Sequence, residues 1–108
     1  MTRTELITLI ESVIEKLDVL GGSIPEGESS QQLDQLRDRL SSQQLQLAQE
    51  QFDENTAVFK AATAKLAEVN ANLKTTINQI DKLVETVENI KRFVSAVDEI
   101  IGAAVAVV

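Results

Sequence analysis

The chain has 108 residues, a formal net charge of −7 and a hydrophobic content of 44%, which suits a single domain with a buried core. It contains no histidine, cysteine, tryptophan or tyrosine, so the usual general base, all thiol chemistry and the commonest metal ligands are missing. We therefore expect no enzymatic activity, no metal ion and no cofactor. Nucleic-acid binding is not expected either, because an acidic chain with three phenylalanines as its only aromatic residues lacks the means to neutralise phosphates and stack bases.

The first predicted element is a short helix over residues 4–20. Apolar residues recur there at steps of three and four, on one helix face: Leu6, Ile10, Val13, Leu17 and Leu20. Residues 21–29 are predicted to form a loop, because three of the four glycines and the only proline gather there. This loop has no lysine and follows no strand, so it does not predict a phosphate-binding site.

Residues 30–101 contain no proline and no glycine, and they predict one long helix. From Phe52 onward, apolar residues recur in heptads without a slip, and the positions assigned to a helix-packing interface are Leu66, Val69, Leu73, Ile80, Leu83, Val87, Ile90, Val94, Val97 and Ile101. Four further apolar residues widen this stripe toward the C-terminus: Ile77, Val84, Phe93 and Ile100. A wide stripe predicts a bundle in which the helix contacts more than one neighbour.

The leucines of residues 31–51 are out of phase with the later stripe, since Leu40 and Phe52 are 12 residues apart where two heptads span 14. The long helix is therefore predicted to kink, break or change its packing partner near residues 41–45. Taken as one helix, residues 30–101 would be about 108 Å long, so most of the stripe needs partners from elsewhere. Two interpretations stay open: a helical bundle formed by self-association, which we favour, or a fold-back within residues 69–78, where asparagine and threonine are indifferent helix formers.

Two polar residues, Asn55 and Thr76, interrupt the apolar stripe. Buried polar side chains at such positions can specify register and oligomer state, and we predict a register-setting polar layer at these two residues. The alternative is polarity tolerated beside water or a fraying end. Carboxylate pairs at helical spacing, such as Glu11 with Glu15, lie off the apolar stripes and indicate solvated helix faces rather than a metal site.

Residues 102–108 form an uncharged apolar tail that is too short to span a bilayer. Three interpretations stay open: the tail packs against the first helix or a partner chain, it belongs to a longer apolar segment, or it inserts shallowly into a membrane. Acidic residues interrupt the apolar part of the N-terminus, so no cleavable signal is predicted. We expect a cytoplasmic protein, with secretion without a cleaved signal left open.

The sequence thus predicts an all-α protein with a single helical domain over residues 1–108. Its predicted function is non-enzymatic: self-assembly into a homo-oligomer and interaction with a protein partner, as an adaptor, a scaffold or a component of a larger machine. Residues 1–54 carry the whole net charge, so antiparallel association would relieve repulsion. The alternative function is a membrane-active protein that inserts its apolar segments, with a general architecture similar to that of helical pore-forming toxins.

Overall fold

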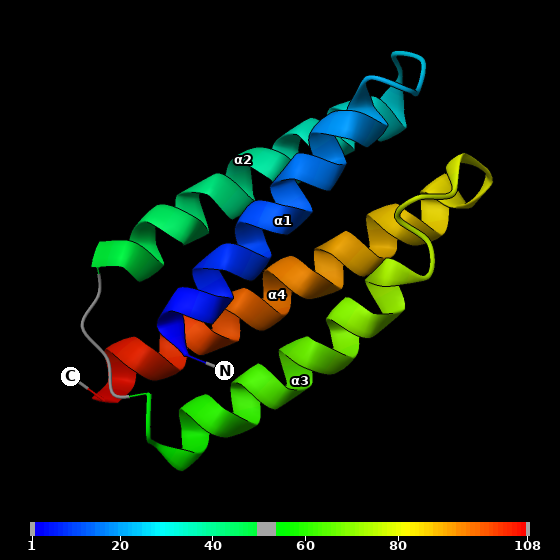
Figure 1. Cartoon of the computed structure of the whole chain (residues 1–108). Helices are drawn as coiled ribbons and strands as arrows, with labels where there is room; N and C mark the ends of the chain where they lie inside the picture. Colours follow the sequence, from blue (N-terminus) through cyan, green and yellow to red (C-terminus); the bar gives the residue numbers. More distant parts are fainter. Residues whose placement is uncertain (1, 50–53, 108) are drawn as a thin grey trace.

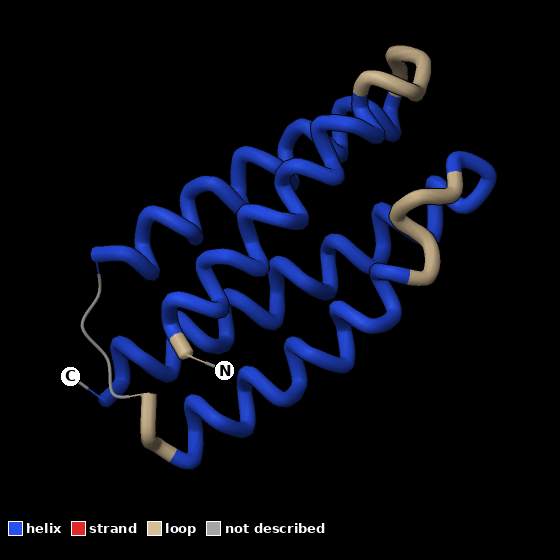
Figure 2. The backbone as a smooth tube through the Cα atoms, viewed as in Figure 1, coloured by secondary structure: helices blue, strands red, loops and turns tan. Residues whose placement is uncertain are grey.

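The computed structural model describes residues 2–49 and 54–107, together with all side chains there except those of Ile80 and residues 103–107. The chain is mainly helical, and these described residues form no strand (Figures 1 and 2). The helices are α1 (Arg3–Gly21), α2 (Glu28–Gln49), α3 (Ala57–Lys74) and α4 (Leu83–Val107), and a 3-10 turn, η1 (Ile80–Lys82), leads into α4.

Threonine side chains begin α1 and α3. The Thr2 hydroxyl accepts a hydrogen bond from the Glu5 N–H at 3.2 Å, and the Thr56 hydroxyl accepts one from the Phe59 N–H at 3.1 Å. Such caps satisfy amides that have no carbonyl partner inside the helix. At the other end of α1, the Gly22 N–H donates to the Asp18 carbonyl at 3.2 Å, and residues 22–27 then connect α1 to α2.

The helices form two hairpins, α1–α2 and α3–α4, which pack together mainly through α2 and α4. Both hairpin turns lie at one end of the molecule and both chain termini at the other (Figure 1). The molecule measures 43 × 23 × 18 Å and its radius of gyration is 14.0 Å, close to the value of about 13 Å expected for a compact chain of this length.

The prediction of one continuous helix over residues 30–101 is wrong, since that helix would be more than twice as long as the whole molecule. Instead, α2 ends at Gln49, α3 begins at Ala57, and the chain reverses again between Lys74 and η1. The second reversal agrees with the alternative interpretation, a fold-back within residues 69–78. It needs neither glycine nor proline, because the N–H groups of Thr75 and Thr76 bond to carbonyls three residues earlier and tighten the end of α3.

The break predicted near residues 41–45 is also wrong, because α2 is continuous from Glu28 to Gln49. Its buried face follows steps of three and four through Leu33, the half-buried Leu36, Leu40, Gln43 and Leu47. Gln43 thus occupies a position on this face that is usually apolar. The change of phase occurs after α2, where the chain leaves one hairpin for the other.

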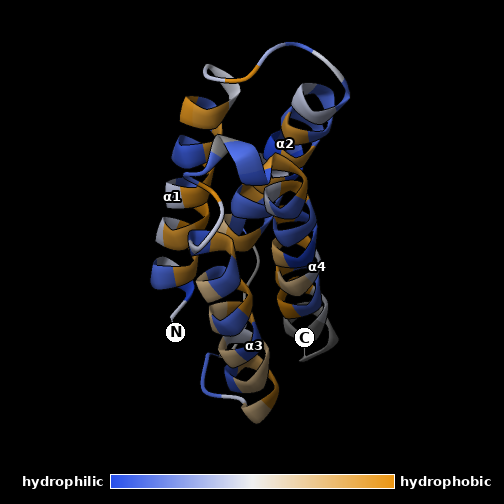
Figure 3. Cartoon of the chain, turned by 90° about the vertical axis from the view of Figure 1, so that its right-hand side faces the viewer, coloured by the Kyte–Doolittle hydropathy of each residue, from blue (hydrophilic) through white to orange (hydrophobic). Residues whose placement is uncertain are grey.

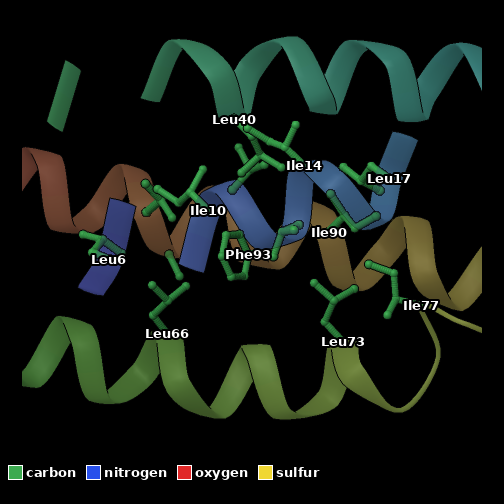
Figure 4. Packing of buried hydrophobic residues seen from close by; sticks show 14 of the residues in the cluster. Leu6, Ile10, Ile14, Leu17, Leu40, Leu66, Leu73, Ile77, Ile90 and Phe93 are labelled. Carbon is green, nitrogen blue, oxygen red and sulfur yellow. The ribbon is translucent and has the colours of Figure 1, made fainter. Parts of the chain in front are cut away.

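The core lies between the four helices, each of which carries hydrophobic and hydrophilic residues (Figure 3). Close up, side chains from α1, α2, α3 and α4 meet around Phe93, the largest of the fully buried side chains that the structure describes (Figure 4). The labelled members of this cluster are Leu6, Ile10, Ile14, Leu17, Leu40, Leu66, Leu73, Ile77, Ile90 and Phe93. The predicted tail is part of this architecture, since α4 continues through residues 102–107 as helix.

Candidate interaction site

The residues predicted to form a helix-packing interface contribute mostly to the core of their own chain. Val69 and Leu83 are half-buried against that core, and the side chain of Ile80 lies outside the described part. The other seven are buried: Leu66, Leu73, Val87, Ile90, Val94, Val97 and Ile101. Of the residues that widen the stripe, Ile77, Phe93 and Ile100 are also buried, whereas Val84 is 73% exposed.

The two residues predicted to form a register-setting polar layer, Asn55 and Thr76, lie at opposite ends of α3. Asn55 is exposed and precedes α3, Thr76 is buried and follows it, and the helix between them is about 27 Å long. Thr76 instead joins the two helices of its hairpin: its hydroxyl accepts a hydrogen bond from Asn89 Nδ2 at 3.2 Å and donates to the Leu73 carbonyl at 3.4 Å.

A polar cluster that the sequence did not reveal lies between α2 and α4. The Gln43 side chain is buried, and its Nε2 donates to the Val94 carbonyl and to Asp98 Oδ1, each at 2.9 Å. Arg39 completes the cluster with hydrogen bonds of 3.0 and 2.9 Å to the two carboxylate oxygens of Asp98. The spacing of Gln43, three residues after Leu40 and four before Leu47, places it on the apolar face of its helix and is the one feature of the sequence that indicates its burial.

A second contact between charged side chains joins the two helices of the α1–α2 hairpin. The guanidinium of Arg37 donates from Nε to Asp18 Oδ1 and from Nη2 to Asp18 Oδ2, the latter at 3.3 Å. The hydrogen bonds from Arg37 lower the pKa of the Asp18 carboxyl below its ordinary value, and the positive charge of Arg37 adds to this effect. Both side chains are largely exposed, so the pair contributes little to stability.

We expect Arg37→Gln to raise the pKa of Asp18 toward its ordinary value, because the charge-assisted hydrogen bonds are lost. A carboxyl resonance followed by NMR during a pH titration measures this shift. Because the pKa is lowered in the folded chain, the pair stabilises it above the ordinary pKa of the carboxyl, and this contribution is lost as the pH falls through the lowered pKa. Arg39→Gln is the matched control, since Arg39 pairs with Asp98; an equal shift of Asp18 in that variant would contradict the assignment.

The side of the bundle formed by α1 and α3, which we call the α1/α3 seam, is the side where neighbouring helices are least closely packed. Extensive close contacts among the described helices join α1 to α2, α2 to α4 and α3 to α4, whereas α1 and α3 have at most a weak contact of this kind. A surface hollow lies near each end of the seam. The first is lined by Glu5, Lys60, Thr63, Ala64 and Ala67. The second is lined by Lys16, Val19, Leu20, Ser23, Ile77 and Asn78.

Small side chains of α3 leave space along the seam. Ala64 and Ala67 are exposed there, and Val19 is an exposed apolar residue at the other end of the seam. Larger residues at the alanine positions would fill the space between α1 and α3. The arrangement therefore offers a narrow apolar face, bordered by Glu5, Lys16 and Lys60, on which a further helix can lie.

The described residues contain no group of three or more acidic side chains placed to hold a metal ion. Among them, too, no helix is long and apolar enough to cross a membrane. Comparison with family models, with curated proteins and with solved structures gave no match.

Proposed function

We propose that the chain is a non-enzymatic helical bundle that acts by self-assembly and by presenting helix faces to a protein partner, as an adaptor, a scaffold or a component of a larger machine. The observation that supports this function is the α1/α3 seam. It combines loosely packed neighbouring helices with exposed alanines and a hollow near each end. A helix laid along the seam would bury apolar surface, which favours association.

The occupant that we propose for the seam is a second copy of the chain in antiparallel orientation. α1 and α3 both run from the end with the chain termini to the end with the hairpin turns (Figure 1). A two-fold axis across the seam would therefore bring Glu5 of one copy toward Lys16 of the other, and opposite charges attract.

We expect Ala67→Arg to raise the dissociation constant of the seam dimer about tenfold or more, which corresponds to about 1.4 kcal/mol. The long charged side chain would occupy the seam, while the fold remains because arginine is nearly as good a helix former as alanine. Light scattering and small-angle X-ray scattering over a concentration series measure the mass and shape of the wild type and the variant.

Ala48→Arg provides the matched control, because Ala48 is an exposed alanine on α2, away from the seam. This control should associate like the wild type. A monomer at every concentration would refute self-association. Equal effects of the two substitutions would refute the seam as the interface.

A further inference from the structure

The turn between α3 and α4 is built largely from helical backbone. Thr75 has helical dihedral angles, and the Ile77 N–H donates to the Leu73 carbonyl at 3.0 Å, the same spacing as in the body of an α-helix. Leu83 is helical again, whereas Gln79 is extended, with φ −114° and ψ 108°. The reversal of the chain thus depends on very few residues, of which Gln79 is the clearest.

Nothing in the sequence of this turn forbids a straight helix. Residues 75–79 contain no glycine or proline, and no described residue of the chain has a positive φ. The heptad stripe also continues through the turn, from Leu73 and Thr76 to Leu83 and Val87. The α1–α2 connection differs, because Pro25 lacks an N–H group and restricts the residue before it.

We propose that two copies of the chain exchange α4, with residues 75–82 straightened so that α3 and α4 form one helix. In the exchanged dimer, α4 of each copy packs against α2 and α3 of the other. We call the structure described above, in which α4 packs within its own chain, the closed chain. Every contact that α4 makes there is made between chains in the exchanged dimer, including Gln43 with Val94 and Lys65 with Glu99. Such an exchange forms a dimer without requiring a new complementary surface.

The register of the hairpin fits this dimer. Lys65 lies level with Glu99, with Nζ 3.1 Å from Oε1, and Thr76 lies level with Asn89. In the sequence, the midpoint of each pair falls at residues 82–83. A two-fold axis that passes between the two straightened helices at these residues therefore preserves the pairing of α3 with α4. The same axis places Val84, which is 73% exposed in the closed chain, opposite Ile80 of the second copy. The exchange thereby covers an apolar side chain next to the turn.

The closed chain and the exchanged dimer share their core, so concentration and the helix propensity of the turn decide between them. Docking of α4 within one chain benefits from an effective concentration in the millimolar range. Exchange is therefore expected when the chain refolds at a comparable protein concentration. This inference goes beyond the seam contact, since each half of the exchanged dimer still carries its own α1/α3 seam.

The test compares Gln79→Ala with Gln79→Gly, two substitutions at one exposed position that is extended in the closed chain. Alanine favours a helical residue over glycine about fivefold, and the dimer contains two turns, so its dissociation constant should be about 25-fold lower for Gln79→Ala. Each variant is refolded from urea at millimolar concentration, and size exclusion with light scattering measures the dimer. Small-angle scattering should show a particle longer than about 76 Å, the length of a helix over residues 57–107.

A second measurement identifies which helices have exchanged. A mixture of 14N-labelled and 15N-labelled protein is refolded, and a carbodiimide joins the Lys65 amine to the Glu99 carboxylate in the isolated dimer. Mass spectrometry should find crosslinked peptides that contain one light and one heavy half. Crosslinks within one isotope only, in a genuine dimer, would refute the exchange of α4 while leaving self-association through the seam intact.

Two further outcomes would overturn the exchange. The absence of a dimer after refolding of Gln79→Ala at millimolar concentration would show that the turn does not straighten. Equal dissociation constants for the alanine and glycine variants would show that residue 79 is not helical in the dimer. Ala67→Arg, which tests the seam, should leave the exchanged dimer unchanged, so failure of the proposed function and failure of this inference give different results.

Discussion

Phe93→Ala is expected to lower the free energy of unfolding by about 3–5 kcal/mol. The Phe93 side chain is 0% exposed and lies where the four helices meet (Figure 4). Its removal would lose apolar burial and leave a cavity that the neighbouring helices cannot fill completely. The loss is a large fraction of the total stability of a small domain, which is about 5–15 kcal/mol. Urea unfolding followed by circular dichroism measures it, since the chain has no tryptophan or tyrosine for fluorescence.

Val84→Ala is the control for this substitution, because Val84 lies on the same helix but is exposed. At concentrations where the chain is monomeric, its effect should stay within about 0.5 kcal/mol. A loss of less than about 1 kcal/mol for Phe93→Ala would mean that the ring does not occupy the centre of the bundle.

Gln43→Glu is expected to lower the free energy of unfolding by about 3–5 kcal/mol at pH 7. Gln43 is 2% exposed, and its amide donates to the Val94 carbonyl and to Asp98. An ionised carboxylate cannot donate these hydrogen bonds, and it would place a buried negative charge beside that of Asp98. Burial and the like charge would both raise the pKa of the introduced carboxyl in the folded chain.

The sign of the pH dependence follows from that raised pKa. Below the unfolded-state pKa of about 4.3 the introduced carboxyl is neutral in both states, so the ionisation penalty is absent. As the pH rises through this value the unfolded chain ionises first, and the penalty grows until the pH passes the raised pKa of the folded chain. Unfolding in urea at pH 4 and pH 7 should show the larger deficit, relative to wild type, at pH 7.

Two controls separate burial from the change in charge. Gln35→Glu makes the same change at an exposed position of α2 and should alter stability by no more than about 0.5 kcal/mol. Gln43→Leu removes the amide together with its Oε1, which has no hydrogen-bond partner among the described residues, so its effect should also be small. A deficit for Gln43→Glu no larger than that for Gln35→Glu would contradict burial of the amide.

The elements that carry strong local signals were predictable. The apolar steps of residues 4–20 agree with α1, and the glycines and proline after it agree with the connection at residues 22–27. On the stripe of α4, Val87, Ile90, Val94, Val97 and Ile101 are all buried. These features depend on sequence neighbours within a turn or two of helix, where spacing and burial are directly related.

The predicted break in α2 was misplaced because the phase difference between Leu40 and Phe52 does not show where between them the chain changes direction, and α2 is continuous to Gln49. The burial of Gln43 was missed because burial of a polar residue depends on a distant partner. Gln43 resembles the other glutamines around it, and only the Val94 carbonyl and Asp98 on α4 satisfy its amide in the core. Without these acceptors, a buried amide would be costly and an apolar residue would be expected. The candidate α1/α3 seam was unpredictable for a related reason, because it depends on which helices lie side by side.

The sequence by itself determined that the protein is all-helical and that its side chains include no thiol and no imidazole. Only the tertiary structure decided what the long stripe packs against. A heptad stripe specifies a face and not its partner, because the same residues can face a second chain or the other arm of a hairpin. The turn at Gln79 joins two helices without glycine or proline, and the packing of α4 against α2 and α3 is what stabilises that reversal.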